Sequence, residues 1–250
     1  MAVLLAEFTK LKRSLSWVVV VLLPTVLVLT GSVMTLIDGR GLEDGWHTLW
    51  MRSFVFPGLF PMAVGIAILA SLSWRVEHRG SSWNALMAGP TSSRRVVLAK
   101  ATVIAVLAVL MQVIAVISVV VLGKLAFGLP GWLPPEYLLI CALVMLACVP
   151  VAAVQSGLSM LIRSFAGPVA LGFLFSGLGV VLLLMGLDAV VLVSPYATLS
   201  RATQLGTGTF ADTGEATASV IGMIVAASLL LSIVILAIST ALLDRRDVRT

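Results

Sequence analysis

Six long apolar runs alternate with short polar segments along the chain. The hydrocarbon core of a bilayer is about 30 Å thick, and roughly twenty helical residues cross it. Each run is long enough to do so and is predicted to be a transmembrane helix. The predicted spans cover about residues 15–37, 54–74, 96–123, 137–162, 167–187 and 218–243. The predicted fold class is therefore all-α, a polytopic membrane protein with residues 1–250 in a single membrane domain.

The segment before the first span, about residues 1–14, has a helical pattern of its own. The apolar positions at helical spacing are Val3, Leu4, Phe8 and Leu11, and the charged positions elsewhere on the helical wheel are Glu7, Lys10 and Arg13. This pattern predicts a short amphipathic helix lying in the membrane interface. The alternative is a frayed cytoplasmic tail.

The composition supports a membrane environment. Hydrophobic residues make up 60% of the chain and charged residues only 11%, which lies outside the range of soluble domains. The formal net charge is +5, but the cations flank apolar runs and form no stripe with interleaved aromatic residues. The lipid bilayer is therefore an expected partner, and nucleic acid is not.

The distribution of the cations predicts the orientation of the chain. Six spans with both termini in the cytoplasm place twelve of the 16 lysine and arginine residues inside. Outside they leave only Arg40, Arg52, Lys124 and Arg201. Because loops rich in lysine and arginine stay on the cytoplasmic side, this bias predicts cytoplasmic termini.

Residues 75–95 form the most basic loop, and it lies between the second and third spans. Within it, Glu77 to Ala88 reads as a short helix that ends at Gly89-Pro90. The residues that form one exposed apolar face on this helix are Trp83, Leu86 and Met87. A cytoplasmic loop has no core in which to bury such a face. The face therefore requires either the lipid headgroup region or a protein partner, and the physical argument leaves both open.

The loops on the other side differ in character. Residues 38–53 are acidic and contain Trp46 and Trp50, as expected of an aromatic belt at the interface. The loop 188–217 begins with a short apolar stretch, Ala189 to Val193, which is predicted to dip back into the membrane before Pro195 turns it. Non-helical backbone at that depth must be covered by protein.

Motifs that would indicate an enzyme are absent from the sequence. There is no GxxxxGK[ST] phosphate loop, HExxH, CxxC or GxSxG. The chain is therefore predicted to hydrolyse no nucleotide and to bind no metal or other cofactor. No ionisable residue lies near the middle of a predicted span, which argues against ion-coupled transport.

Few polar side chains lie deep within the predicted spans. They are Gln112 in the third span and Gln155 and Ser156 in the fourth. We consider them candidate pathway-lining residues. The alternative for each glutamine is a hydrogen bond between two helices, worth about 1 kcal/mol or less.

The basic loop and the N-terminus carry a resemblance to a known family. The loop reads Glu77-x-x-Gly80-Ser81-x-Trp83-x-x-Leu86-Met87-x-x-Pro90-x-Ser92-x-Arg94, followed by Lys100 at the start of the third span. This arrangement resembles the first cytoplasmic loop of ABC type-2 transporter permeases. The N-terminal stretch Glu7-Phe8-x-Lys10-Leu11-Lys12-Arg13-Ser14 and a first span with Pro24 resemble the branch that exports lantibiotic and bacitracin-type peptides. Six spans in 250 residues agree with this family over essentially the whole chain.

The resemblance implies a permease subunit of an ATP-driven exporter. Its basic loop would carry the coupling helix, which sits in a groove of a separate ABC ATPase that binds ATP and Mg²⁺. The implied coupling residues are Glu77, Arg79, Trp83, Leu86 and Met87, flanked by Arg94 and Arg95. A second permease subunit, identical or homologous, would complete the pathway. The implied substrate is amphipathic, such as a peptide antibiotic in self-immunity or resistance, and the implied location is a bacterial inner membrane.

Two other functional classes remain as alternatives. An ion-coupled secondary carrier or channel would need an inward-facing carboxylate, for which Asp188 is the best candidate. A membrane-embedded enzyme or assembly factor would have no transport role. A neighbouring reading frame with a phosphate-loop motif would favour the ABC permease.

Overall fold

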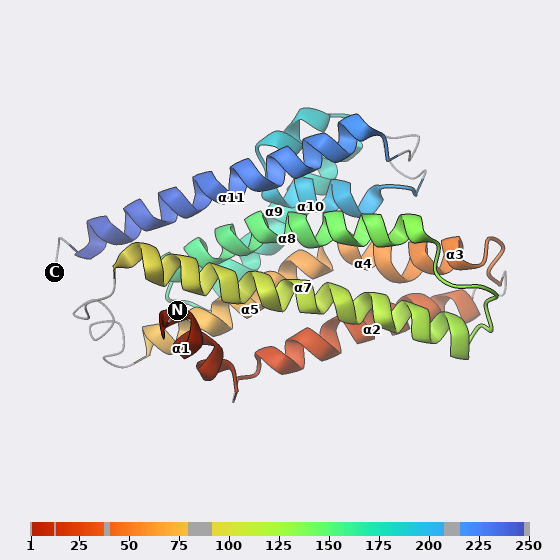
Figure 1. Ribbon diagram of the computed structural model, residues 1–250, viewed down its shortest axis with the longest axis horizontal. Coiled ribbons are helices and arrows are strands. Elements are labelled where there is room, and N and C mark those ends of the chain that lie inside the picture. The colour runs from red at the N-terminus through yellow and green to blue at the C-terminus, as the bar shows by residue number, and fades with distance from the viewer. Residues whose placement is uncertain (1, 13, 38–40, 80–91, 208–215, 248–250) are drawn as a thin grey trace.

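The computed structural model describes residues 2–12, 14–37, 41–79, 92–207 and 216–247. All regular secondary structure in the described residues is helical, and Figure 1 shows the long helices running side by side as a bundle. The elements are α1 (Ala2–Leu11), α2 (Ser16–Ile37), α3 (Trp46–Trp50), the π-helix η1 (Met51–Val55), α4 (Phe56–Leu59), α5 (Pro61–His78), α7 (Ser93–Leu125), α8 (Pro135–Leu161), α9 (Ala166–Leu184), the 3₁₀-helix η2 (Asp188–Leu192), α10 (Pro195–Gln204) and α11 (Ala218–Asp247).

Five of the described helices are long and apolar enough to cross a membrane. They are α2, α7, α8, α9 and α11. They coincide with five of the six predicted spans, with ends that differ by a few residues. The all-helical fold class is thus confirmed for the described part of the chain, whereas the count of six spans stays a prediction.

The second predicted span, residues 54–74, is not one continuous helix. The chain there passes from η1 through α4 to α5, and Phe60 breaks the helix with φ −140° and ψ −29°. Pro61 explains the break, because it lacks a backbone N–H and disfavours helical geometry in the residue before it. After the break α5 continues to His78, one turn beyond the predicted end.

The broken helix exposes a backbone carbonyl inside the protein, and neighbouring helices satisfy it. The carbonyl oxygen of Leu59 accepts a hydrogen bond from Ser200 Oγ of α10 at 2.9 Å and another from Ser176 Oγ of α9 at 3.2 Å. A carbonyl left without a partner in an apolar interior would cost several kcal/mol. The two serine hydroxyls therefore join the break to two later helices.

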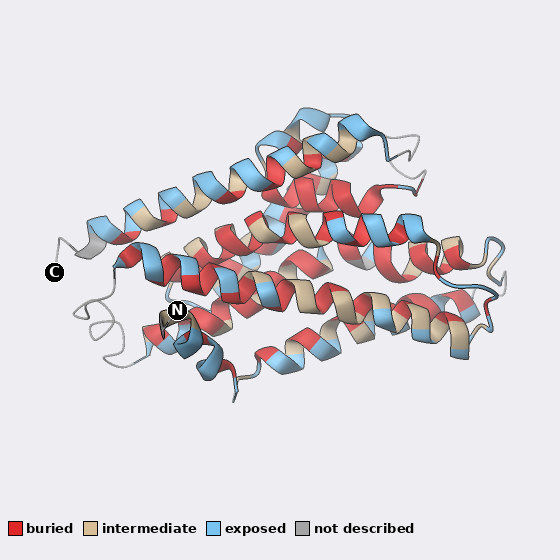
Figure 2. Cartoon of the chain, viewed as in Figure 1, coloured by how far each residue is buried: buried red, intermediate tan, exposed pale blue. Residues whose placement is uncertain are grey.

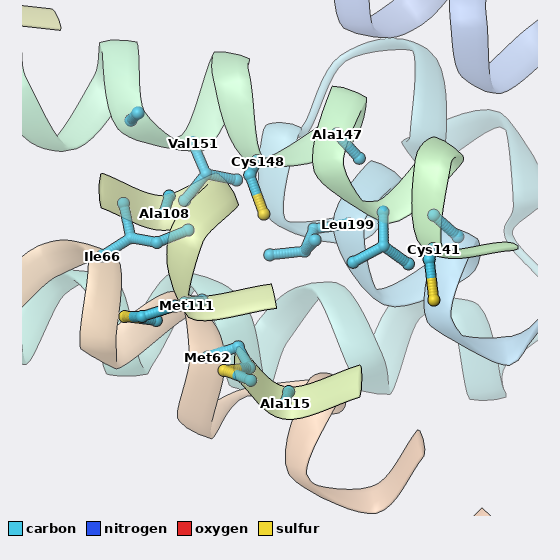
Figure 3. Close-up of a cluster of buried hydrophobic side chains, with 14 of the residues drawn as sticks. Met62, Ile66, Ala108, Met111, Ala115, Cys141, Ala147, Cys148, Val151 and Leu199 are labelled. Carbon is cyan, nitrogen blue, oxygen red and sulfur yellow. The ribbon is translucent and has the colours of Figure 1, made fainter. Parts of the chain in front are cut away.

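The core of the bundle lies where α5, α7, α8 and α10 meet. Figure 3 shows Met62 and Ile66 of α5 facing Met111 of α7, with Cys148 of α8 and Leu199 of α10 close by. These side chains are fully or almost fully buried. Cys148 is a free thiol that serves as one of the packing side chains.

Helix α10 is buried along its whole length, as the burial colours in Figure 2 show. It contacts α8, α9, α11 and α4. The apolar stretch before Pro195, which was predicted to dip back into the membrane, lies mostly in η2, where Val191 is fully buried and the following Val193 is 74% exposed. Its position in the membrane stays a prediction. The mixed helix α10 can be buried because its hydroxyls find backbone acceptors, for example Thr198 Oγ1 to the carbonyl of Val191 at 2.7 Å.

The prediction that Trp46 and Trp50 form an aromatic belt at the interface was wrong. Trp50 is fully buried and stacks on Phe54 and Tyr137, with ring centroids 4.0 and 4.8 Å apart. Trp46 is also buried, and its Nε1 donates to the carbonyl of Pro130 at 2.9 Å. Both tryptophans lie on or beside the short helix α3, which folds back against the bundle instead of remaining a surface loop.

Helix α1 and the C-terminal end of α11 lie at the same end of the bundle. Figure 1 shows α1, the end of α5, the start of α7 and the end of α11 together at this end, with α3 and α4 at the other. We call the first the charged end, since its described cations include Lys10, Lys12, Arg75, Arg79, Arg94, Arg95, Lys100, Arg163 and Arg245.

Candidate functional site

Four charged side chains from three helices meet in one cluster at the charged end. Lys10 Nζ of α1 lies 2.7 Å from Glu7 Oε1 and 2.6 Å from Glu77 Oε1 of α5. Lys100 Nζ of α7 lies 2.7 Å from Glu7 Oε2 and 2.9 Å from Glu77 Oε1. Each lysine thus bridges the two carboxylates, and we call these four residues the charge cluster.

Three members of the charge cluster are buried although they are ionisable, whereas the side chain of Lys10 is 38% exposed. Lys100 is 1% exposed, Glu77 4% and Glu7 7%. Lys100 Nζ also donates to the carbonyl of Ser73 at 3.0 Å and lies 5.4 Å from the centroid of the Trp74 ring. Two positive and two negative charges balance, and the contacts are short hydrogen bonds, which is the condition under which buried charges are tolerated.

The ion pairs also change the pKa values of two members. Burial alone would raise the pKa of Glu77, but Lys100 and Lys10 outweigh it, so the pKa lies below its usual range. Burial lowers the pKa of Lys10, but hydrogen bonds and charges from Glu7 and Glu77 outweigh that effect and raise the pKa. Both groups are therefore charged at neutral pH.

These directions predict how stability depends on pH. The contribution of Glu77 is fully present above its unfolded pKa of about 4.3 and is lost as pH falls through the lower folded value. The contribution of Lys10 is present below about pH 10.4 and is lost as pH rises through the higher folded value. We expect a melting temperature that is nearly constant between about pH 5 and 9 and falls below about pH 4. Fluorescence-monitored melting in detergent measures it.

The Glu77→Gln variant is the control for this prediction. It has no carboxyl group to protonate at this position, so its melting temperature should fall less steeply in acid than that of the wild type. Equal slopes for the two proteins would contradict the assignment of the acid sensitivity to Glu77.

Helix α1 docks on the bundle through a face that the sequence analysis did not predict. The sequence analysis placed Glu7 off the apolar face that was predicted to meet the membrane interface, and it predicted no contact with the bundle. In the structure Glu7 and Leu11 are buried against the bundle, while Leu5 and Phe8 are exposed. Glu7 points inward because Lys100 offers it a buried partner. The interfacial position of α1 stays a prediction, with Leu5 and Phe8 as the side chains that would face lipid.

The comparison with known protein families agrees with the resemblance to ABC type-2 permeases, whereas the assignment to the branch that exports lantibiotic and bacitracin-type peptides stays a prediction. A family model described as ABC-2 family transporter protein matches residues 3–179, which is more than half of the chain and includes the whole charge cluster. The chain belongs to the ABC-2 transporter family. This family forms the membrane permeases of ABC transporters, so the chain is a membrane protein that is not itself catalytic and works with an ABC ATPase. No curated protein and no solved structure gave a significant match.

The predicted coupling residues of this permease fall into three groups. Glu77 points into the subunit, where the charge cluster holds it. Arg79, Arg94 and Arg95 are exposed, the first directly after α5 and the others in the first turn of α7. The remaining three, Trp83, Leu86 and Met87, lie outside the described residues.

The candidate pathway residues of the permease make hydrogen bonds between helices. Gln155 Nε2 of α8 donates to Tyr196 Oη of α10 at 2.7 Å, and Ser156 Oγ accepts from Trp74 Nε1 of α5 at 3.0 Å. Gln112 Nε2 of α7 lies 3.7 Å from Cys148 Sγ of α8. All three polar residues are buried and contact a second helix within the subunit. For the two glutamines this is the hydrogen bond between helices that the sequence analysis gave as the alternative, and a role of the three residues in a pathway stays a prediction.

Sequence reasoning did not identify the charge cluster as a site. One feature of the sequence could have indicated it. Lys100 lies inside an apolar run, and a lysine that enters the membrane region needs a carboxylate as its partner. In the predicted topology only four carboxylates lie on its side of the membrane, namely Glu7, Glu77, Asp244 and Asp247. That short list contains both observed partners.

Proposed function

We propose that this permease is the transmembrane subunit of an ATP-driven exporter in a bacterial inner membrane. In this proposal it has six spans, with both termini in the cytoplasm at the charged end of the bundle. The second span is α4 and α5 together, despite the break at Phe60. Residues 80–91, which connect α5 to α7, carry the coupling helix that meets the ATPase.

The charge cluster is the observation that carries this proposal. Glu77 lies three residues before the connecting segment, and Lys100 lies within the third turn of the helix that follows it. Their ion pair holds the two ends of the segment together, and Lys10 ties α1 to the same point. A push on the segment by an ATPase would therefore move α1, α5 and α7 as one unit.

The proposed roles of the coupling residues follow from their positions. Trp83, Leu86 and Met87 present the apolar face that enters a groove of the ATPase. Arg79, Arg94 and Arg95 are exposed and flank this face, where they can pair with acidic side chains of the partner. Glu77 acts inside the subunit as a positioning residue, because its carboxylate contacts Lys10 and Lys100.

An amphipathic substrate fits the exposed surface of the subunit. An apolar groove of about 580 Å³ lies between α2 and the broken second span, lined by Leu27, Met34 and Phe56 among others and by Arg52 at one side. Such a groove suits a molecule with an apolar body and a polar end, such as a peptide antibiotic. A second permease subunit would cover this open surface and complete the pathway.

Ion-coupled transport is the weaker alternative. It required a carboxylate facing the interior, and its best candidate was Asp188. That residue is exposed at the start of η2. The buried ionisable groups of the charge cluster lie at one end of the bundle and are already paired with one another.

Co-purification from native membranes in mild detergent tests the proposed function. We expect an ATP-hydrolysing subunit to accompany the wild-type permease and to be lost with Trp83→Asp, because a charge on the apolar face opposes its burial in a groove. Trp132→Asp is the matched control, since Trp132 lies between α7 and α8 at the opposite end and is exposed.

The two possible failures have different meanings. If no ATP-hydrolysing subunit accompanies the wild type, the exporter proposal is wrong. If the subunit is retained equally by wild type, Trp83→Asp and Trp132→Asp, the protein has an ATPase partner but residues 80–91 are not the coupling segment.

A further inference from the structure

A cluster of basic side chains lies on the side of the last turn of α5 that faces away from Glu77 and the charge cluster. It surrounds a pocket of about 250 Å³ between the end of α5 and the turn that joins α8 to α9. Its lining residues with a basic side chain are Arg75, His78 and Arg163, and those with a hydroxyl are Ser71, Ser159 and Ser164. The pocket lining contains no carboxylate. The pocket therefore offers cations and hydrogen-bond donors to an anion.

The basic groups converge from segments far apart in the sequence. Arg75 and His78 are three residues apart on one face of α5, while Arg163 lies in the tight turn after α8. His78 Nε2 donates to the carbonyl of Ser159 at 2.8 Å, which fixes the end of α5 against α8. In the described part of the chain neither arginine forms an ion pair with a carboxylate. Their charges are thus available for a ligand.

The position of the pocket indicates what kind of anion it meets. It lies beside the last turn of α5, where the membrane-length helix α8 ends and the membrane-length helix α9 begins. The ends of helices that cross a bilayer lie near the level of the lipid phosphates. Its wall includes the apolar side chains of Ile162 and Phe165, and the Arg75 guanidinium lies 6.0 Å from the centroid of the Phe165 ring. From Phe165 onward α9 presents exposed apolar side chains such as Phe173 and Leu174. Basic groups next to an apolar lipid-facing helix match a phospholipid, which has a phosphate and acyl chains.

We propose that this pocket binds the headgroup phosphate of an anionic phospholipid, with Arg75 and Arg163 as its two charged ligands. Arginine suits this role because its planar guanidinium can give a phosphate two parallel hydrogen bonds. Basic pockets between transmembrane helices are a recurrent form of lipid headgroup site. The site does not depend on the proposed function, and only the leaflet, the cytoplasmic one, follows from the proposed topology.

Binding at this pocket would hold the last turn of α5 from a second side. Glu77 attaches one face of the turn to α1 and α7, and Arg75 and His78 attach the opposite region to α8, α9 and the lipid. The segment 80–91 starts directly after this turn. The content of anionic lipid in the membrane would then determine how firmly the last turn of α5, which precedes this segment, is held in place.

Titration with short-chain lipids tests the site on the purified permease. The probes are dioctanoyl phosphatidylglycerol, dioctanoyl phosphatidylcholine and inorganic phosphate, each at the same ionic strength, with the melting temperature and native mass spectrometry as readouts. We expect phosphatidylglycerol alone to bind and to raise the melting temperature. Its half-saturating concentration should rise about tenfold in Arg75→Gln and in Arg163→Gln.

Matched variants separate lost binding from lost folding. Arg245→Gln removes an exposed charge from the end of α11, away from the pocket, and should bind as the wild type does. Arg75→Lys and Arg163→Lys keep the charge and should retain a preference for phosphatidylglycerol over phosphatidylcholine. Without lipid all variants should melt close to the wild type, because both arginines are exposed.

Three results would overturn the proposal. The first is equal phosphatidylglycerol binding by Arg75→Gln, Arg163→Gln and Arg245→Gln. The second is an equal response to inorganic phosphate or to phosphatidylcholine, which would remove the anionic lipid as the ligand. The third is that Arg75→Gln and Arg163→Gln bind phosphatidylglycerol as the wild type does but lose the ATPase in co-purification, which would show that the pocket receives a carboxylate of that partner instead.

Discussion

Replacing Lys100 by methionine should lower the free energy of unfolding of the permease by about 3–5 kcal/mol. Methionine fills a similar volume but leaves the carboxylates of Glu7 and Glu77 buried together, with only Lys10 to balance them. Two like charges in a buried site repel each other, and one has to take up a proton or move towards water. Helix α1 should detach first, since Lys100 binds its Glu7 directly.

The measurement is reversible unfolding in detergent, followed by tryptophan fluorescence. Lys12→Met makes the same substitution on an exposed lysine at the same end of the bundle and should change the stability by less than about 0.5 kcal/mol. Adding Glu77→Gln to Lys100→Met should restore part of the loss, because one buried negative charge is removed with its partner. A loss below about 1 kcal/mol for Lys100→Met would mean that water already screens the cluster.

Replacing Trp50 by alanine should cost about 3–5 kcal/mol of unfolding free energy. Trp50 has no exposed surface, and its ring stacks between Phe54 of η1 and Tyr137 of α8. Its removal leaves a cavity where the irregular start of the second span meets the bundle. A backbone made of short helices cannot easily close that cavity, because the bonds from Ser176 and Ser200 to the Leu59 carbonyl already hold its far end.

Trp132→Ala is the control for this experiment. Trp132 is 77% exposed, so its truncation should change the unfolding free energy by only about 0.5 kcal/mol. Chemical unfolding of both variants in the same detergent gives the comparison, with circular dichroism as the probe. Similar losses for the two tryptophans would place Trp50 at a surface and contradict the fold of residues 46–59.

The positions of most long helices could be predicted from the sequence because the hydrophobic effect acts on each segment alone. Whether residues 137–162 are apolar enough to enter a bilayer depends on those residues and on the lipid, and α8 forms there as expected. The same is true of the short segment around Arg163, which separates the predicted spans 137–162 and 167–187 and which forms the turn between α8 and α9.

The break at Phe60 shows where such local reasoning ends. Pro61 was visible in the sequence, but a proline can also be tolerated within a membrane helix when neighbours satisfy the backbone. Here Ser200, which lies 141 positions further along the chain, donates to the carbonyl of Leu59. No pattern within the second span predicts a partner so distant in sequence.

The burial of the tryptophans has the same cause. Tryptophans near the end of a span, such as Trp46 and Trp50, are typical of an interfacial belt, and a sequence pattern cannot distinguish a ring that faces lipid from one that faces protein. For Trp46, a glycine on another helix allows the ring to pack against the protein. An added Cβ on Gly123 of α7 would lie 2.4 Å from the Trp46 ring, so only glycine leaves room for it.

The sequence by itself determined the all-helical membrane fold, the location of five apolar helices, the charge asymmetry between the two ends and the resemblance to ABC-2 permeases. Each of these depends on residues that are neighbours in the chain, or on the composition and charge of the chain as a whole. The tertiary structure alone decided that Glu7, Lys10, Glu77 and Lys100 meet in one cluster. It also decided that Arg75 and Arg163 face the same pocket. Ion pairs and hydrogen bonds act over a few ångströms, so they depend on which helices pack together, and helix periodicity does not specify that.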